Sequence, residues 1–397
     1  MKTDLRAWAE INLDAVGHNV RMIRNCLKPG VKLLGVVKAD AYGHGAVEVA
    51  REVLRNGADC LAVAFCDEAV ELRQNGIDVP ILILGNSTYA DIERIIEYDI
   101  TTAVSDVLFA EKLSLLALEK GKKVKVHVKV DTGMSRIGFL TDNEEDCIIS
   151  CNEILKVAKL SGIEVEGMFT HFASADEENE GYTRMQYERF VRFNERLKAE
   201  GLVIPVKHAC NSAGLIKFPE MQLDMVRAGI IIYGMYPSRE FDRNLIELVP
   251  AMKFKARVSQ VKKLDAGSCL SYGMTYKLEN TMKIATISVG YADGYPRNLS
   301  NRASVFVNGE TTGQIGRICM DQCMIDATRV NNINIGDEVT LFGDAEPNGV
   351  SVDSIAELLG TINYEVTCGI SKRVPRVYIK NGKIVGTCNH ILQKYGL

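Results

Sequence analysis

A lysine stands directly after a short apolar run near the start of the chain. Residues 33–37 read Leu-Leu-Gly-Val-Val, which is typical of a strand buried on both faces of a parallel sheet. An unpaired buried charge is costly, so Lys38 must be paired with an anion or lowered in pKa and used in chemistry. Tyr42 follows in a turn of small residues, 39–45, where the backbone can approach a ligand closely. Taken alone, the segment is equally compatible with a strand that ends in a solvated lysine.

Polar and charged side chains also follow four later apolar segments. A lone histidine or arginine is more often structural than functional. If these segments are parallel strands of one barrel, however, their polar ends converge on one mouth, and a functional site becomes the better interpretation. The candidate residues at the four ends are Lys129, Arg136, His171, Asn211, Ser212, Arg227, Gly229 and Ile230.

The elements that would position these residues alternate between strand and helix. Such alternation predicts a parallel sheet, and eight strands within about 200 residues fit a closed (β/α)8 barrel of the TIM type. An open doubly wound sheet shares the rhythm, but its Gly-x-Gly-x-x-Gly fingerprint is missing after the first strand. The predicted strands cover residues 33–37, 60–65, 79–84, 100–104, 124–130, 164–170, 203–209 and 225–228.

The pattern changes near Pro237. From about residue 248 the apolar segments are short, and the Asn-Gly pairs at 308–309 and 381–382 favour hairpins. We therefore expect a barrel domain over residues 14–240 and a mostly β domain over 241–397. The N-terminal strand within residues 1–13 is expected to join the second domain.

Composition limits the class of protein. The chain has 397 residues, a net charge of −4 and no basic run, which argues against nucleic acid or an anionic membrane as the main partner. No apolar run approaches the roughly 20 residues of a membrane span, and the start lacks the apolar core of a signal peptide. A cytoplasmic location with reduced thiols is expected. No metal site is expected either, because the Cys147/Cys151 and Cys319/Cys323 spacings lack nearby histidines.

The string Val36-Val37-Lys38-Ala39-Asp40-Ala41-Tyr42-Gly43-His44-Gly45 resembles the cofactor-lysine motif of the alanine racemases, which use pyridoxal 5'-phosphate (PLP). The resemblance implies that Lys38 forms a Schiff base with PLP and that Tyr42 helps to hold the phosphate. Residues 131–136, Asp-Thr-Gly-Met-Ser-Arg, resemble the family's barrel arginine motif, which places Arg136 near the substrate carboxylate. Lys129 matches a lysine that is carbamylated in many members, although an ordinary buried ion pair remains open.

The ends of the last three strands resemble the same family. The resemblance implies that Arg227 faces the PLP pyridine nitrogen and that His171 supports Arg227. Because arginine stays protonated, the ring nitrogen stays unprotonated, and a less stabilised carbanion is reprotonated at Cα rather than diverted to transamination. The residues that match the family's phosphate cup are Asn211, Ser212, Gly229 and Ile230.

The second domain carries the remaining motifs. Residues 270–276 resemble the family's tyrosine motif, which implies that Tyr272 serves the Cα face opposite Lys38. In the family this tyrosine comes from the partner subunit of a head-to-tail homodimer. Taken alone, Tyr272 is a hairpin aromatic that is more often structural. Three further strings imply that Tyr291 and Arg317 line the entrance, that the Met320 backbone contacts the substrate carboxylate, and that Tyr364 reaches the phosphate and narrows the entrance.

The resemblance runs from about residue 8 to residue 376 and predicts an alanine racemase. The enzyme would interconvert L- and D-alanine through an external aldimine with two bases, Lys38 and Tyr272, and supply D-alanine for peptidoglycan. A related racemase that prefers serine remains open. A non-catalytic PLP-binding protein is a second alternative, but relatives of that kind lack a second domain. A decarboxylase would need an acidic partner for the ring nitrogen, and Arg227 argues against it.

Overall fold

The computed structural model describes residues 4–343 and 349–393. The chain forms two compact units. The barrel unit comprises residues 16–41 and 46–249. The β unit comprises residues 1–15, 42–45 and 250–397. The short segment 42–45, which forms the end of the cofactor-lysine motif, thus belongs to the β unit although it interrupts the sequence of the barrel unit.

Eight parallel strands form the barrel, in the order β10-β2-β3-β4-β5-β6-β8-β9. Asp224 N donates to Lys207 O at 3.1 Å and Arg227 N to Cys210 O at 3.1 Å. These bonds join the β10 segment to the β9 segment, the two ends of this order, and so close the barrel. The predicted (β/α)8 barrel is confirmed. The strands are β2 (Lys32–Val36), β3 (Cys60–Val63), β4 (Ile81–Ile83), β5 (Thr101–Val104), β6 (Val124–Asp131), β8 (Ile163–Phe169), β9 (Val206–His208) and β10 (Met225–Ala228).

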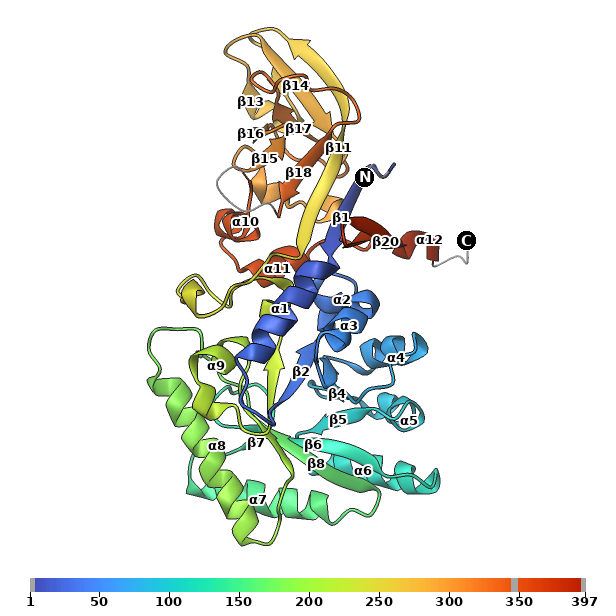
Figure 1. Cartoon of the computed structure of the whole chain (residues 1–397), viewed down its shortest axis with the longest axis vertical. Coiled ribbons are helices and arrows are strands. Elements are labelled where there is room, and N and C mark those ends of the chain that lie inside the picture. Colours follow the sequence, from blue (N-terminus) through green and yellow to red (C-terminus); the bar gives the residue numbers. More distant parts are fainter. Residues whose placement is uncertain (1–3, 344–348, 394–397) are drawn as a thin grey trace. The chain divides into compact units, whose positions relative to one another are not determined.

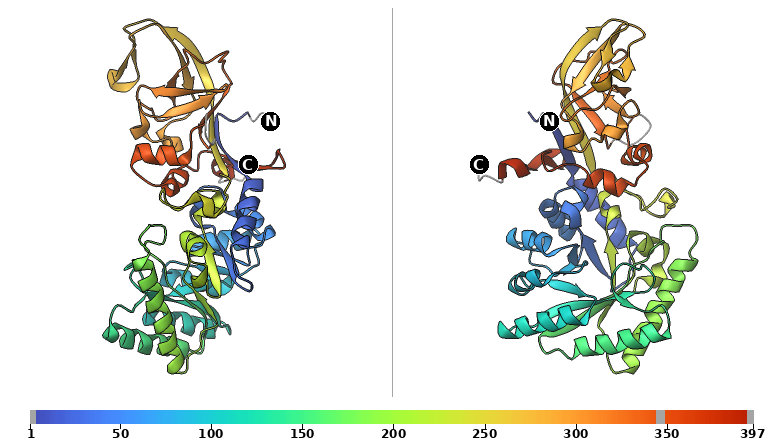
Figure 2. Two further views of the ribbon diagram at one scale, coloured as in Figure 1. Left: turned by 60° about the vertical axis from the view of Figure 1, so that its left-hand side comes forward. Right: turned by 180° about the vertical axis from the view of Figure 1, so that it is seen from behind.

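Helices lie on the outer side of these strands, as Figure 1 and the two further views in Figure 2 show. Buried apolar side chains such as Leu61, Ile83 and Val126 fill the space around the strands. The longer connecting helices are α3 (Ala46–Arg55), α4 (Cys66–Gln74), α5 (Ile92–Glu97), α6 (Val107–Glu119), α7 (Glu144–Ala158) and α8 (Gly181–Ala199). The sequence pattern missed the two-residue strand β7 (Phe139–Leu140) and the short helix α9 (Ser212–Lys217).

The β unit is built on a nine-stranded sheet, confirming a mostly β second domain. β1 (Ala7–Asn12) runs antiparallel to the long strand β11 (Met252–Leu264), with Ala9 opposite Phe254. Both Asn-Gly hairpins form, and Asn308 and Gly309 take φ values of 48° and 85°. The other strands of the sheet are β14 (Met282–Ile287), β15 (Ser304–Val307), β16 (Glu310–Ile315), β17 (Cys323–Asp326), β18 (Glu338–Phe342), β19 (Arg376–Lys380) and β20 (Lys383–Cys388).

Short helices accompany this sheet. They are α10 (Val352–Leu359), α11 (Asn363–Cys368) and α12 (His390–Gln393). Across residues 4–343 and 349–393, no helix is both long and apolar enough to cross a membrane. Within the same ranges, no cluster of three His, Cys, Asp or Glu side chains has the geometry of a metal site.

Candidate active site

Lys38 opens a left-handed turn immediately beyond β2. Ala39, Asp40 and Ala41 all have φ of 53°, a conformation that costs a residue with a Cβ about 1–2 kcal/mol. Two side chains fix the turn: Glu68 Oε1 accepts from Ala39 N at 2.6 Å, and Asp40 Oδ1 accepts from Ala46 N at 2.8 Å. Strain that is held by its surroundings in this way concentrates at functional sites.

Arg227 on β10 is the centre of the polar groups in the barrel unit. Its side chain is buried, and its Nη atoms donate to the carbonyl oxygens of Thr170 and Ala209, each at 2.8 Å. Nη1 also donates to Nδ1 of His208 at 2.9 Å, and Nη2 lies 3.3 Å from Nδ1 of His171. Among the described residues no acceptor meets Nε–H, so this donor is available to a ligand.

The electrostatics around Arg227 favour one cation and neutral neighbours. Burial lowers the pKa of Arg227 to about 10, so the guanidinium is still charged at neutral pH. Burial, followed by the positive charges of Arg227 and Arg136, lowers the pKa of His171 well below its ordinary value. A neutral His171 can accept a hydrogen bond from Arg227 through Nδ1, which is the supporting contact that the resemblance implies.

Lys129 lies near the carboxyl end of β6 and is 2% exposed. Its Nζ donates to Val130 O at 2.8 Å. Burial lowers its pKa to about 7; Asp131 opposes the shift, and Arg227 and Arg136 add to it. A lysine with this pKa is a neutral amine in a large fraction of molecules at neutral pH, and a neutral amine is a nucleophile.

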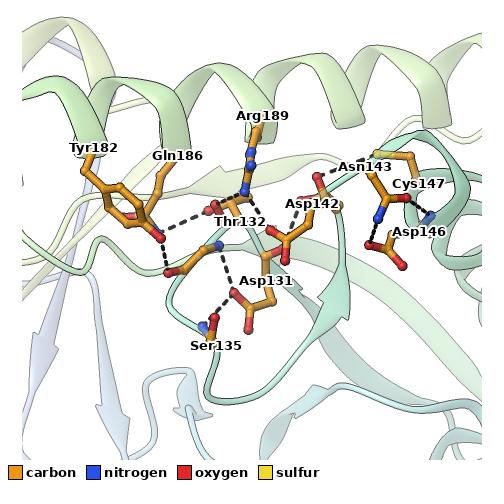
Figure 3. Close-up of polar contacts among 12 residues, drawn as sticks. Asp131, Thr132, Ser135, Asp142, Asn143, Asp146, Cys147, Tyr182, Gln186 and Arg189 are labelled. Atoms are coloured by element: carbon orange, nitrogen blue, oxygen red, sulfur yellow. Dashed lines mark hydrogen bonds and ion pairs between the residues drawn. The ribbon is translucent and has the colours of Figure 1, made fainter.

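The loop that carries Arg136 is held by polar contacts to the residues that precede it (Figure 3). Asp131 Oδ1 accepts from Gly133 N and Ser135 N, each at 3.0 Å. From α8, the Tyr182 hydroxyl donates to Gly133 O at 2.7 Å, and the Arg189 guanidinium donates to Thr132 O at 3.3 Å. Arg136 itself is exposed, so a fixed loop presents a solvent-accessible cation.

The predicted phosphate-cup residues come together after β9 and β10. Ser212 Oγ accepts from Gly229 N at 2.9 Å, which ties the two strand ends to each other. Asn211 caps α9 by accepting from Gly214 N at 2.9 Å. Ile230 begins a 3₁₀ turn, Ile230–Tyr233. Backbone N–H groups at such helix starts lack intrahelical partners and are suited to oxyanions.

In the β unit, Tyr42 and Tyr364 lie beside each other, with ring centroids 6.0 Å apart. The backbone around Tyr42 packs against α11 so closely that a Cβ on Gly43 would lie 2.2 Å from Thr367 O. Arg376, which is 1% exposed, donates from Nε to Gly43 O at 3.0 Å. The pair of tyrosines is therefore fixed by packing within the β unit.

The other predicted residues of the β unit lie on adjoining loops. Ser271 Oγ donates to Arg317 O at 2.6 Å, which joins the Tyr272 loop to the Arg317 loop. Tyr291 N donates to Cys319 O at 3.0 Å, which joins the latter loop to the Tyr291 segment. Tyr272, Met320 and Tyr291 are 68%, 52% and 41% exposed.

The structure thus gathers the predicted residues into two sets, one in each unit. His127, His208 and Glu166 were given no role from the sequence, although His208 bonds Arg227 directly. A signal existed: Lys125, His127 and Lys129 alternate with valines along β6, and alternate residues share one face of a strand. The residues of α8 that hold the Arg136 loop carried no such signal.

Comparison with known proteins identifies the family. The profile for the N-terminal domain of alanine racemase matches residues 11–237, and the profile for its C-terminal domain matches residues 251–378. An alanine racemase of Clostridium perfringens is 49% identical over 386 residues, covering 97% of this chain and 98% of the relative. Alanine racemase 1 of Clostridium acetobutylicum is 48% identical over 384 residues, with the same coverage.

Solved structures agree with this result. The alanine racemase of Clostridium difficile 630 superposes with a TM-score of 0.93 at 44% identity, and the match covers 98% of this chain and all of the other. Both the sequence and the fold match over nearly the full length of the chain. The chain belongs to the alanine racemase family.

Proposed function

We propose that this protein is a PLP-dependent alanine racemase that interconverts L- and D-alanine. The observation that carries the proposal is the Arg227 centre, a buried guanidinium held by carbonyls and neutral imidazoles with Nε–H available. A cation at this position suits a ring nitrogen that stays unprotonated, which favours return of a proton to Cα. The relatives named above are alanine racemases, which supports the same substrate for this chain.

The residues fit PLP. When bound, PLP acts as the electron sink that makes the Cα proton of an amino acid acidic. Lys38 would hold the cofactor covalently, Arg227 would donate from Nε–H to its ring nitrogen, and His171 would keep Arg227 in place. The groups proposed to hold the phosphate are Tyr42, Asn211, Ser212, Gly229, Ile230 and Tyr364.

Racemisation requires a proton to leave one face of Cα and another to arrive on the opposite face. We assign the Lys38 amine to one face and the Tyr272 hydroxyl to the other. Arg136 would bind the substrate carboxylate through its planar donor fork, and the Met320 backbone would provide a second contact. Tyr291, Arg317 and Tyr364 would line the entrance, and a narrow entrance disfavours side chains larger than that of alanine.

The proposed working form is a head-to-tail homodimer in which each site takes Tyr272 from the partner subunit. This arrangement accounts for the exposure of Tyr272 and Met320 in a single chain. Within each chain, the proposed domains are residues 14–240 and 241–397, with 1–13 joining the second. The proposed role is to supply D-alanine for peptidoglycan, and the proposed location of the protein is the cytoplasm.

We also propose that Lys129 is carbamylated. Its neutral Nζ would attack the carbon of CO2 and release a proton, leaving a carbamate anion. The charge of the side chain would change from positive or neutral to negative, next to Arg136 and Arg227, whose positive charges lower the pKa of the amine. The carbamate would then pair with and position Arg136.

The experiment that tests the function uses the purified protein with L-alanine or L-serine, with and without added PLP, and chiral analysis of the product. D-alanine formed faster than D-serine, and dependent on PLP, is the expected result. Faster formation of D-serine would favour the serine-racemase alternative. PLP binding without any D-amino acid would support the non-catalytic carrier.

A further inference from the structure

Two histidines and a glutamate continue from Arg227 through the interior of the barrel. Nη1 of Arg227 lies 2.9 Å from Nδ1 of His208, and Nε2 of His208 lies 2.8 Å from Nδ1 of His127. Nε2 of His127 in turn lies 3.4 Å from Oε2 of Glu166. The two imidazoles are 0% and 4% exposed. The four side chains form one hydrogen-bonded row, which we call the Arg227–Glu166 row.

The chemistry of the end groups gives the row a single direction. Arginine only donates, so Nδ1 of His208 must accept and its proton resides on Nε2. That Nε2–H donates to Nδ1 of His127, whose own proton then resides on Nε2 and points at the Glu166 carboxylate. Burial, and then the charge of Arg227, lowers the pKa of His208 well below its ordinary value, so the ring is neutral as this direction requires.

Backbone irregularity aims Glu166 at the row. Between β6 and β8, Val126 is opposite Val165 and His127 is opposite Gly167, so Glu166 is the extra residue of a β-bulge. Bulges redirect side chains in this way. At the next position, a Cβ on Gly167 would lie 2.5 Å from the ring of His127. A bulge and a glycine together allow the imidazole to lie where it meets both His208 and Glu166.

Such a row is unusual inside a barrel, where branched apolar side chains normally fill the space. Buried polar groups are costly unless each is bonded, and here every ring nitrogen has a partner. The hydrogen bond from His127 is the main factor that lowers the pKa of Glu166 to about 2. Its other oxygen meets Lys125 Nζ at 2.9 Å.

The carboxylate end of the row is not sealed in apolar surroundings. Glu166 and His127 line a cavity of about 220 Å3 at the amino-terminal ends of the strands, together with Lys32 and Thr101. The cation at the candidate active site is therefore connected to an ionised carboxylate at the opposite end of the barrel through His208 and His127. No anion closer to Arg227 appears among its described hydrogen-bond partners.

We propose that Glu166 and His127 are positioning residues for Arg227. They fix His208 with Nδ1 unprotonated, so that Arg227 meets acceptors on that side and keeps Nε–H for the ligand. The inference rests on the proposed function, because that function gives Arg227 its place opposite the PLP ring nitrogen. A neutral amide at position 166 can donate to His127 instead, which permits the reversed row. His208 would then present Nδ1–H to the guanidinium, and two donors would face each other.

The test compares wild type, Glu166→Gln and the control Glu164→Gln. Glu164 is exposed on the same strand, so the control removes the same charge without touching the row. Protein labelled with ¹⁵N-histidine, with and without PLP, is studied by long-range ¹H–¹⁵N NMR, which shows which ring nitrogen carries the proton. The kcat and KM for alanine racemisation are measured on the same samples.

Wild type and Glu164→Gln are expected to show protons on Nε2 of both His127 and His208. Glu166→Gln is expected to show Nδ1–H at one or both rings. Its kcat should be about tenfold lower and its KM within about twofold of wild type, the size of effect found when a residue that orients a ligand-binding side chain is replaced. Unchanged tautomers and unchanged kcat in Glu166→Gln would overturn the proposal. An equal loss of kcat in Glu164→Gln would overturn it as well.

The NMR result separates this proposal from the proposed function. If wild type failed to racemise alanine, the proposed function would be refuted. The tautomers of His127 and His208 in the PLP-free protein would still test the direction of the hydrogen bonds in the Arg227–Glu166 row. Gly167→Ala provides a second variant, since its Cβ displaces His127 without changing any charge. It is expected to reproduce the tautomer change of Glu166→Gln, and wild-type tautomers in this variant would contradict the geometry.

Discussion

Arg227 of the barrel unit and Tyr272 and Met320 of the β unit differ sharply in how they are held. In the barrel unit, Arg227 is buried and meets two imidazoles and three backbone carbonyls. In the β unit, Tyr272 and Met320 are 68% and 52% exposed. The barrel unit therefore contains a preorganised polar centre, whereas the Tyr272 loop lacks surroundings of that kind within its own unit. This difference supports the proposed homodimer, in which Tyr272 would complete the site of a partner subunit.

A second comparison shows that burial alone does not mark function. Arg376 in the β unit is as buried as Arg227, but its described hydrogen bonds go to backbone carbonyls of Gly43, Ile370, Ser371 and Val374. Those bonds join three chain segments, which is a structural role. Arg227 is held in part by imidazoles, whose tautomers can change.

The largest expected effect on activity concerns Lys38 in the barrel unit. Lys38→Ala should abolish racemisation and the visible absorbance of bound PLP, because no other side chain in the proposal attaches the cofactor. Absorption spectroscopy and the chiral assay measure both. Lys32→Ala, an exposed residue at the other end of β2, is the matched control and should keep both properties. Retention of the visible band in Lys38→Ala would refute the assignment of Lys38.

The next largest effect on activity concerns Tyr272 in the β unit. Tyr272→Phe should lower racemisation about 10²–10⁴-fold, the usual contribution of a general acid or base. The two directions must fall equally, because the free energies of L- and D-alanine are the same. Exchange of the Cα proton with D2O should instead persist for one enantiomer and be lost for the other.

Tyr276→Phe is the control for that variant, since Tyr276 packs against the small apolar cluster that includes Leu270. It should leave both exchange rates close to those of wild type. Equal loss of exchange for the two enantiomers in Tyr272→Phe would contradict the two-base assignment and leave Tyr272 as a structural residue of its hairpin.

The smallest effect is on stability and concerns Lys129. Its pKa of about 7 in the folded state is below the unfolded value, so between pH 7 and 10.5 the unfolded chain binds more protons. Stability from this group therefore rises with pH in that window. In CO2-free buffer, wild type should gain about 2 kcal/mol between pH 7 and pH 9 relative to Lys129→Met, measured by urea unfolding. Parallel pH profiles of the two proteins would show that the pKa of Lys129 is not lowered.

Sequence patterns were sufficient for the architecture because the signals are local and repeated. The strand and helix alternation predicted the barrel, and Asn308-Gly309 and Asn381-Gly382 predicted two hairpins that form. The left-handed turn at residues 39–41 could not be predicted, because it contains no glycine. It depends on Glu68, whose side chain arrives from a different helix.

The same limit applies to the candidate site. Motifs led to Arg227, Ser212 and Gly229, since each stands at or just beyond the end of a predicted strand, but the hydrogen bond from Gly229 N to Ser212 Oγ came only from the structure. The Arg227–Glu166 row could not be found in this way, because His127 and His208 are 81 residues apart and meet only across the barrel. The bulge that aims Glu166 leaves no mark in the hydrophobic pattern.

The most direct test asks whether Lys38 of one chain works with Tyr272 of another. Lys38→Ala and Tyr272→Phe, each expected to racemise alanine at a small fraction of the wild-type rate or less, are mixed under conditions that allow subunits to exchange, and racemisation is measured. If Tyr272 is supplied by the partner subunit, half of the dimers are hybrids and each hybrid has one intact site. Activity should then recover to about a quarter of wild type. No recovery, despite hybrid dimers confirmed by mass spectrometry, would contradict the account and place both residues in the site of one chain.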